Sequence, residues 1–138
     1  MTTVEKLADL TGRILIGSIF LHAGVSKIGT YAATQAYMSA AGVPGALLAA
    51  VIALEALGGM ALIVGYRTRI VALAIAAFTL LAGFVFHRAP DPMQQVLFLK
   101  NLAIAGGLLI LAARGAGGWS LDARETRLST PGDVLRSS

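Results

Sequence analysis

The chain has 138 residues, of which 57% are hydrophobic and only 13% charged, and its mean hydropathy is +0.78. This excludes an ordinary soluble domain, and the abundance of Ala, Leu, Ile, Val and Gly is typical of closely packed membrane helices. Eleven Lys and Arg against seven Asp and Glu give a net charge of +4, and nothing indicates nucleic-acid binding. With no Cys, the chain can form no disulfide, thiolate metal site or thiol redox couple of its own.

Four apolar segments are predicted to be transmembrane helices, at residues 10–28, 44–65, 70–87 and 96–113. Each is close to the ~20 residues that cross a ~30 Å hydrocarbon core. The short connection 66–69 can only join antiparallel neighbours. The predicted fold is therefore an all-α, integral membrane four-helix bundle that occupies residues 1–122.

Two polar segments lie outside these four helices. The connection 30–41 is compatible with a helix, with a capping residue at Thr30 and a stop at Gly42 before Pro44. It is predicted to be a short helix that lies as a lid on the outer face of the bundle. Residues 123–138 have no apolar period and are predicted to form a disordered tail.

The cations indicate the orientation of the bundle. The N-terminal segment, the second connection and the tail hold Lys6, Arg13, Arg67, Arg69, Arg114, Arg124, Arg127 and Arg136. The opposite side holds only Lys27, Arg88 and Lys100. Because cytoplasmic loops carry the excess of Lys and Arg, both termini are predicted to be cytoplasmic.

Glu55 is the most informative polar residue, because it lies near the middle of the second predicted span. A carboxylate there costs at least ~2.5 kcal/mol on insertion scales, so it is expected to face the bundle interior or to have a partner. Candidate partners lie in the outer half of the other spans, at His22, Lys27, His87, Lys100 and Asn101. Together they predict an outward-facing polar pocket, covered by the segment from Tyr31 to Tyr37.

Each of these residues also has a purely structural interpretation. Lys27 and Lys100 lie near helix ends and can reach the interface with their charged groups, and His87 is compatible with a hydrated helix end. His22 forms a stripe with Ser18 and Ser26 that could hydrogen-bond across helices. Glu55 could be a packing pair with Lys27 or Lys100.

Two further patterns concern packing and metals. Six glycines are predicted to be points where helices approach closely, namely Gly17, Gly24, Gly58, Gly59, Gly106 and Gly107. Two His on different helices and a single intramembrane Glu are too few for a persuasive metal site, so none is predicted. No phosphate loop, dinucleotide motif or Ser-His-Asp arrangement is visible.

Several short patterns, taken in order and spacing, resemble the DoxX family of small four-helix membrane proteins over about residues 10–122. They are Arg13-Ile-Leu-Ile-Gly17 with Phe20, Gly24-Val-Ser-Lys27, Ala41-Gly42-Val43-Pro44, Glu55, Leu62-Ile-Val-Gly65-Tyr-Arg67-Thr68-Arg69, Lys100-Asn101-Leu-Ala-Ile-Ala-Gly-Gly and Ser120-Leu121-Asp122. The resemblance implies a multi-pass protein of the bacterial plasma (inner) membrane. It also implies an association with quinone-linked oxidation, since some relatives are subunits of thiosulfate:quinone oxidoreductase or of a terminal quinol oxidase. Lys27, Glu55, Lys100 and Asn101 occupy the family's polar motif positions, whereas His22 does not.

The first functional hypothesis is a membrane subunit or accessory of a quinone-linked redox system. A quinone would bind in the outer-half pocket to Lys27, Lys100, Asn101, Tyr31, Tyr37 and His87, while Glu55 and His22 transfer protons. The chain has no intrinsic cofactor or identifiable redox centre, so a partner protein or a diffusible donor would supply electrons. Whether the chain is itself an enzyme stays open.

Two other hypotheses belong to different classes. One is a proton-coupled carrier or efflux component for a small hydrophobic molecule, in which Glu55 exchanges protons. The other is a non-catalytic membrane scaffold subunit. Under every hypothesis membrane lipid is a partner, and thin, Ala-rich helices around a polar interior suggest a homo-oligomer.

Overall fold

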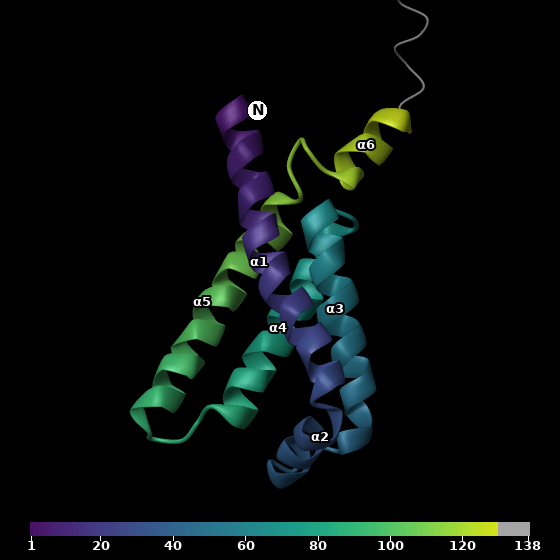
Figure 1. Cartoon of the computed structure of the whole chain (residues 1–138). Coiled ribbons are helices and arrows are strands. Elements are labelled where there is room, and N and C mark those ends of the chain that lie inside the picture. Colours follow the sequence, from purple (N-terminus) through teal and green to yellow (C-terminus); the bar gives the residue numbers. More distant parts are fainter. Residues whose placement is uncertain (130–138) are drawn as a thin grey trace, which may run out of the picture.

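The computed structural model describes residues 1–129, and its regular structure there is entirely helical. Four helices are long and apolar enough to cross a membrane: α1 (Thr3–Gly29), α3 (Leu48–Val64, preceded by the 3-10 turn Gly45–Leu47), α4 (Thr68–Phe86) and α5 (Pro92–Arg114). Two short helices, α2 (Tyr31–Ala40) and α6 (Leu121–Leu128), lie at opposite ends of the bundle (Figure 1). The predicted all-α membrane fold with four spans is confirmed.

Local caps explain where two of the long helices begin. α1 starts before the predicted residue 10 because Thr2 and Glu5 form a capping box, in which each side chain accepts a hydrogen bond from the other's backbone N–H. α5 starts before the predicted residue 96 because Asp91 accepts hydrogen bonds from the N–H groups of Met93 (2.8 Å) and Gln94 (3.3 Å), and Pro92 occupies the first turn. Short polar side chains therefore extend both helices beyond their apolar segments.

The predicted disordered tail needs correction at its start. The proposed boundary at residue 122 falls inside α6, which continues to Leu128. The helix begins where Ser120 Oγ accepts a hydrogen bond from the N–H of Ala123 at 3.1 Å. A side-chain cap of this kind can start a helix in a segment that has no apolar period. The rest of the predicted tail, residues 130–138, lies outside the described part of the chain.

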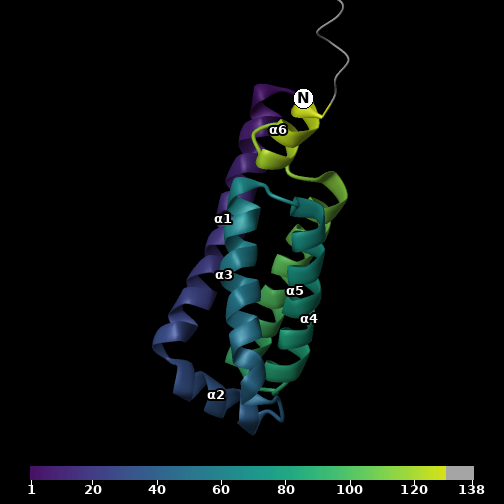
Figure 2. The ribbon, with the colours of Figure 1, turned by 90° about the vertical axis from the view of Figure 1, so that its right-hand side faces the viewer.

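The bundle consists of two helix pairs. α1 packs mainly against α3, α4 packs mainly against α5, and contacts between α3 and α4 are fewer. Figures 1 and 2 show that the N-terminus and α6 lie at one end and α2 at the other, and Figure 1 shows the two pairs diverging toward α2. A buried apolar core joins the pairs through Phe20, Leu62, Ala72, Ile75, Ala76 and Leu108. Both described ends therefore lie at one membrane surface, and their cytoplasmic location stays a prediction.

Glycine brings the backbones of α1 and α3 into direct contact. A Cβ added at Gly59 would lie 2.6 Å from the carbonyl oxygen of Gly17, and one added at Gly24 would lie 2.7 Å from the backbone nitrogen of Ala56. Gly58 is similarly tight against Ile75 of α4, and Gly107 approaches Ile16 less closely. The predicted close approach is wrong for Gly106, where an added Cβ would meet no atom within 4 Å.

A buried arginine holds the end of the bundle that carries the N-terminus. Arg13 of α1 donates hydrogen bonds to the carbonyl oxygens of Leu62 (3.2 Å) and Ile63 (2.8 Å) at the end of α3. It also donates to the carbonyl oxygen of Trp119, just before α6. The Ile63 carbonyl lies in the last turn of α3, where helix acceptors lack a partner four residues on, and the Leu62 carbonyl also accepts from the N–H of Gly65 at 3.2 Å. Arg13 thus joins α1, α3 and the segment before α6.

The glycine contact predicts a difference between two Gly→Ala variants. Gly59→Ala forces a methyl group against backbone atoms of α1 and should destabilise the protein by about 1–3 kcal/mol. Gly106→Ala meets open space and improves helix propensity, so it should leave stability unchanged or raise it. Thermal unfolding in one detergent measures both. Equal losses in the two variants would show that the α1–α3 backbone contact does not limit stability.

Candidate functional site

A cavity of about 560 Å³ lies between the two helix pairs, in the half of the bundle nearest α2. Its walls come from the end of α1, α2, the start of α3, the end of α4 and the start of α5, and most of the lining side chains are apolar. Its volume is in the range of small-molecule sites. Ile19, Leu47 and Leu81 line it and are exposed at the surface, so the cavity opens to the outside of the bundle.

An ion pair forms one wall of the cavity. Lys27 Nζ of α1 lies 2.8 Å from Glu55 Oε2 of α3, and the two side chains are 27% and 7% exposed. Lys27 Nζ also approaches the carbonyl oxygen of Ala23 at 3.4 Å. Of the five candidate partners that the sequence offered for Glu55, the structure pairs it with Lys27. The pairing offsets part of the cost of a carboxylate inside a membrane helix.

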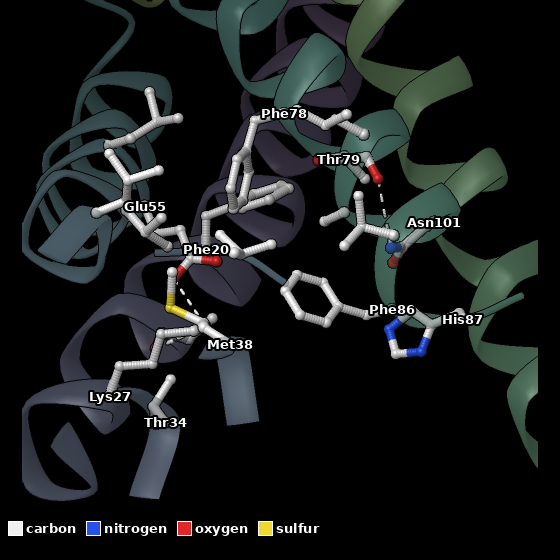
Figure 3. A pocket seen from close by; sticks show the side chains of 18 of the residues that line it. Phe20, Lys27, Thr34, Met38, Glu55, Phe78, Thr79, Phe86, His87 and Asn101 are labelled. Carbon is white, nitrogen blue, oxygen red and sulfur yellow. Dashed lines mark hydrogen bonds and ion pairs between the residues drawn. The ribbon is translucent and has the colours of Figure 1, made fainter. Parts of the chain in front are cut away.

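The opposite wall carries an amide and a second lysine. Asn101 Nδ2 of α5 donates to the carbonyl oxygen of Thr79 on α4, at 3.4 Å, which leaves a second N–H for another acceptor. Lys100 also lines the cavity and is exposed, without an ion-pair partner among residues 1–129. Figure 3 shows Lys27 and Glu55 on one side and Asn101 on the other, with Phe20 between them. Polar groups therefore face each other across an apolar space.

The short helix α2 borders the cavity at the end of the bundle. The Tyr37 ring stacks on the Phe86 ring of α4, with centroids 5.2 Å apart, and this contact connects α2 to the second helix pair. Gln35 Nε2 donates to the carbonyl oxygen of Gly45 at 3.2 Å, which ties α2 to the turn before α3. Thr34, Tyr37 and Met38 line the cavity. The predicted short helix is thus present and contributes to the pocket.

The structure brings together most, but not all, of the predicted site residues. Six of them line the cavity: Lys27, Tyr37, Glu55, His87, Lys100 and Asn101. Figure 3 shows His87 at the edge of the cavity. Its Nδ1 hydrogen-bonds to Gln94 Oε1 at 2.8 Å. His22 and Tyr31 are exposed and do not line the cavity. His22 lies on the face of α1 opposite Phe20, so this placement gives no support to a joint proton transfer with Glu55.

Sequence reasoning missed several lining residues. Thr79 is buried, and its hydroxyl donates to the carbonyl oxygen of Ile75 at 2.7 Å while its own carbonyl positions Asn101. Met38 and Phe20 were also missed, whereas Thr34 was expected only as part of the covering segment from Tyr31 to Tyr37. The only available signal was the polarity of Thr79 in an apolar span, because apolar lining residues cannot be distinguished from core residues in the sequence.

Among residues 1–129, no cluster of three His, Asp or Glu could hold a metal ion.

The ion pair predicts unequal effects for its two single neutralisations. Lys27→Met leaves a buried carboxylate without a partner and should cost about 3 kcal/mol. Glu55→Gln should cost less, because Lys27 is partly exposed and can turn toward water. The double variant Lys27→Met/Glu55→Gln should be more stable than Lys27→Met alone.

Thermal unfolding of the purified variants measures these differences. Lys100→Met serves as the control, since this exposed lysine has no ion-pair partner among the described residues, and it should change stability by less than about 0.5 kcal/mol. Additive losses in the double variant would contradict a coupled pair.

Comparisons with known proteins agree with this architecture. A sequence model of the DoxX family matches residues 8–88, which include most of α1 and all of α2, α3 and α4. The chain is 46% identical over 123 residues to the inner membrane protein YqjF of Escherichia coli (strain K12), covering 88% of this chain and 95% of that protein. It is 33% identical to the inner membrane protein YphA of the same organism, covering 83% and 88%. No solved structure matches. The chain is therefore a member of the DoxX family and a multi-pass protein of the bacterial inner membrane.

Proposed function

We propose that the cavity binds a quinone, or a similar flat apolar molecule with carbonyl groups, and that the protein serves a quinone-linked redox system as a membrane subunit or accessory. The observation that carries the proposal is the placement of hydrogen-bond donors on two opposite walls of a mainly apolar cavity. A 1,4-quinone has the matching chemistry, because its two carbonyl oxygens lie on opposite edges of an apolar ring.

Each wall has an N–H group that makes no hydrogen bond to the protein. An ammonium group has three N–H bonds, and Lys27 uses two of them on Glu55 and Ala23. Asn101 uses one of its two N–H bonds on Thr79. One donor on each side therefore remains for a ligand carbonyl, with Lys100 as a further donor near Asn101. The rings of Phe20 and Phe86 provide apolar surface between the two walls.

In this proposal, residues of the chain transfer protons, and another component transfers the electrons. A bound quinone accepts two electrons and two protons when it becomes a quinol. Glu55 shares its ion pair with Lys27 beside the cavity, so this pair can take up or release a proton close to one carbonyl position. A partner protein or a diffusible donor would provide the electrons. The proposal thus assigns binding and proton transfer to this chain and the redox centre to another component.

The opening of the cavity supports an apolar ligand. Leu81 and Ile19 lie within the spans of α4 and α1, and both line the cavity while being exposed at the bundle surface. A quinone dissolved in the membrane would reach such an opening without crossing water.

The carrier alternative depends on the same carboxylate. Glu55 is already paired with Lys27 at 2.8 Å, so a cationic substrate would have to compete with a cation of the protein itself. This geometry favours the redox proposal over a carrier of cations. Flux driven by a proton gradient in proteoliposomes, present in the native protein and lost in Glu55→Gln, would favour the carrier instead.

Ligand binding by purified protein tests the proposal. Menadione should bind, and naphthalene, which has the same ring system without carbonyls, should bind at least tenfold more weakly if each carbonyl hydrogen bond contributes about 1–1.5 kcal/mol. Equilibrium dialysis and native mass spectrometry measure both affinities.

Two matched variants locate the site. Asn101→Leu keeps the side-chain size and removes the donor, so it should weaken menadione binding by roughly tenfold. His22→Leu changes an exposed residue outside the cavity and should leave binding unchanged. The proposal fails if naphthalene binds as tightly as menadione, or if Asn101→Leu has no effect while the protein stays folded.

A further inference from the structure

A second cavity, of about 420 Å³, lies at the opposite end of the bundle from the cavity between the helix pairs. It is formed by the connection between α3 and α4, the end of α5 and the start of α6. Three arginines line it, Arg67, Arg69 and Arg114, against the single carboxylate of Asp122. The cavity is therefore strongly cationic, and it is separate from the site described above.

The carboxylate in this cavity already accepts two hydrogen bonds from backbone N–H groups. Asp122 Oδ1 accepts from the N–H of Arg67 at 2.7 Å, and Oδ2 accepts from the N–H of Thr68 at 2.9 Å. These are unpaired donors at the start of α4, so Asp122 caps that helix. Both carboxylate oxygens face the backbone, and neither forms an ion pair with the arginine side chains.

Two of the arginines form no ion pair within residues 1–129, although Asp122 and Glu125 lie near enough to Arg67 to favour its charged form. Arg69 donates to the carbonyl oxygens of Ala113 (2.7 Å) and Arg114 (3.2 Å) at the end of α5, which are neutral acceptors. Arg67 donates only through Nε, to the hydroxyl of Tyr66 at 3.3 Å, so its two terminal nitrogens have no hydrogen-bond partner within residues 1–129. Neither residue forms an ion pair in that part of the chain. Their charges and donors remain available to an anion.

A buried hydroxyl in the same cavity also lacks a partner. Thr68 lines the cavity and is only 1% exposed, and its Oγ1 has no hydrogen-bond partner in the described part of the chain. Such groups are rare in native proteins, because a buried polar atom without a hydrogen bond is costly. An acceptor that enters the cavity would satisfy it. Thr68 is thus evidence for a ligand independent of the arginine charges.

The position of the cavity indicates where the anion comes from. Arg67 precedes the first residue of the α4 span and Arg114 is the last residue of the α5 span, so the arginines lie at the depth of lipid headgroups. Ile70, which also lines the cavity, is 68% exposed, and Ile110, one turn before Arg114, is 63% exposed. Cationic groups at the interface with exposed apolar groups below them match a phospholipid.

We propose that this cavity is a binding site for the phosphate group of an anionic membrane lipid. Arg67 and Arg69 provide the positive charge, and the Thr68 hydroxyl donates to a phosphate oxygen. The acyl chains lie along the exposed surface at Ile70 and Ile110. The site lies at the end of the bundle that the charge distribution predicts to be cytoplasmic, where anionic lipids attract juxtamembrane arginines.

Native mass spectrometry of the full-length protein, titrated with defined lipids, tests the proposal. Phosphatidylglycerol should bind more tightly than phosphatidylcholine. Arg67→Gln should weaken phosphatidylglycerol binding roughly fivefold, in line with about 1 kcal/mol for each arginine near a membrane surface. Arg127→Gln is the matched control, because Arg127 lies in α6 at the same end but does not line the cavity, and it should leave the affinity unchanged.

Substitutions of Thr68 distinguish ligand binding from a structural role. Thr68→Val removes a hydroxyl that has no protein partner, so it should not lower the melting temperature of the lipid-free protein, yet it should weaken phosphatidylglycerol binding several-fold. Thr68→Ser keeps the hydroxyl and should retain binding. Arg69 is left unchanged, because it also holds the end of α5.

Inorganic phosphate identifies the source of the anion. If millimolar phosphate neither displaces phosphatidylglycerol nor raises the melting temperature, the ligand is the lipid, as proposed. If phosphate alone stabilises the native protein but not Arg67→Gln, and the lipid shows no preference, the lipid proposal is overturned in favour of a soluble phosphate. The cavity is not an anion site if both lipids bind equally and phosphate has no effect. The same conclusion follows if Arg67→Gln and Arg127→Gln lose equal affinity for phosphatidylglycerol.

Discussion

The direct contact between the backbones of α1 and α3 is the constraint on which the rest of the structure depends. Gly17 and Gly59 allow the two helices to touch near the middle of the bundle, and Gly24 extends this contact to Ala56. Because Lys27 follows Gly24 by about one turn and Glu55 directly precedes Ala56, the same contact brings the ammonium and carboxylate to 2.8 Å. A side chain at any of these glycines would separate the helices and with them the ion pair. In a membrane, where apolar burial does not drive helix association, such close packing is a main source of attraction.

The two ends of the bundle differ in how they are held. At the end that carries the N-terminus, Arg13, Asp122 and Arg69 hydrogen-bond to terminal backbone groups of α3, α4 and α5. At the other end the helix pairs diverge, and α2 connects them mainly through stacked Tyr37 and Phe86. This asymmetry leaves room for the larger cavity in the half nearest α2. The family patterns divide in the same way: those around Arg13, Arg67–Arg69 and Asp122 close one end, whereas Lys27, Glu55, Lys100 and Asn101 line the cavity.

The two cavities make different demands on a ligand. The larger one is mainly apolar with separate donors on opposite walls, and it opens between exposed side chains of the spans. The smaller one is cationic and lies beside the start of the α4 span and the end of the α5 span. A membrane-dissolved molecule with carbonyl groups suits the first, and a lipid phosphate suits the second. Because the two sites share no lining residue, binding at either can be tested without disturbing the other.

The sequence by itself determined the membrane class, the four spans, the short helix after the first span and the position of one carboxylate, Glu55, within a span, because these are local properties. It also indicated the family and the set of polar residues in one half of the bundle. Only the tertiary structure decided which residues meet. Lys27, rather than Lys100, pairs with Glu55, and His22 faces away from the cavity although it lies on the same helix as Lys27. The rotation of each helix is set by the glycine contacts between helices, and helical periodicity in an almost uniformly apolar span does not specify which face turns inward.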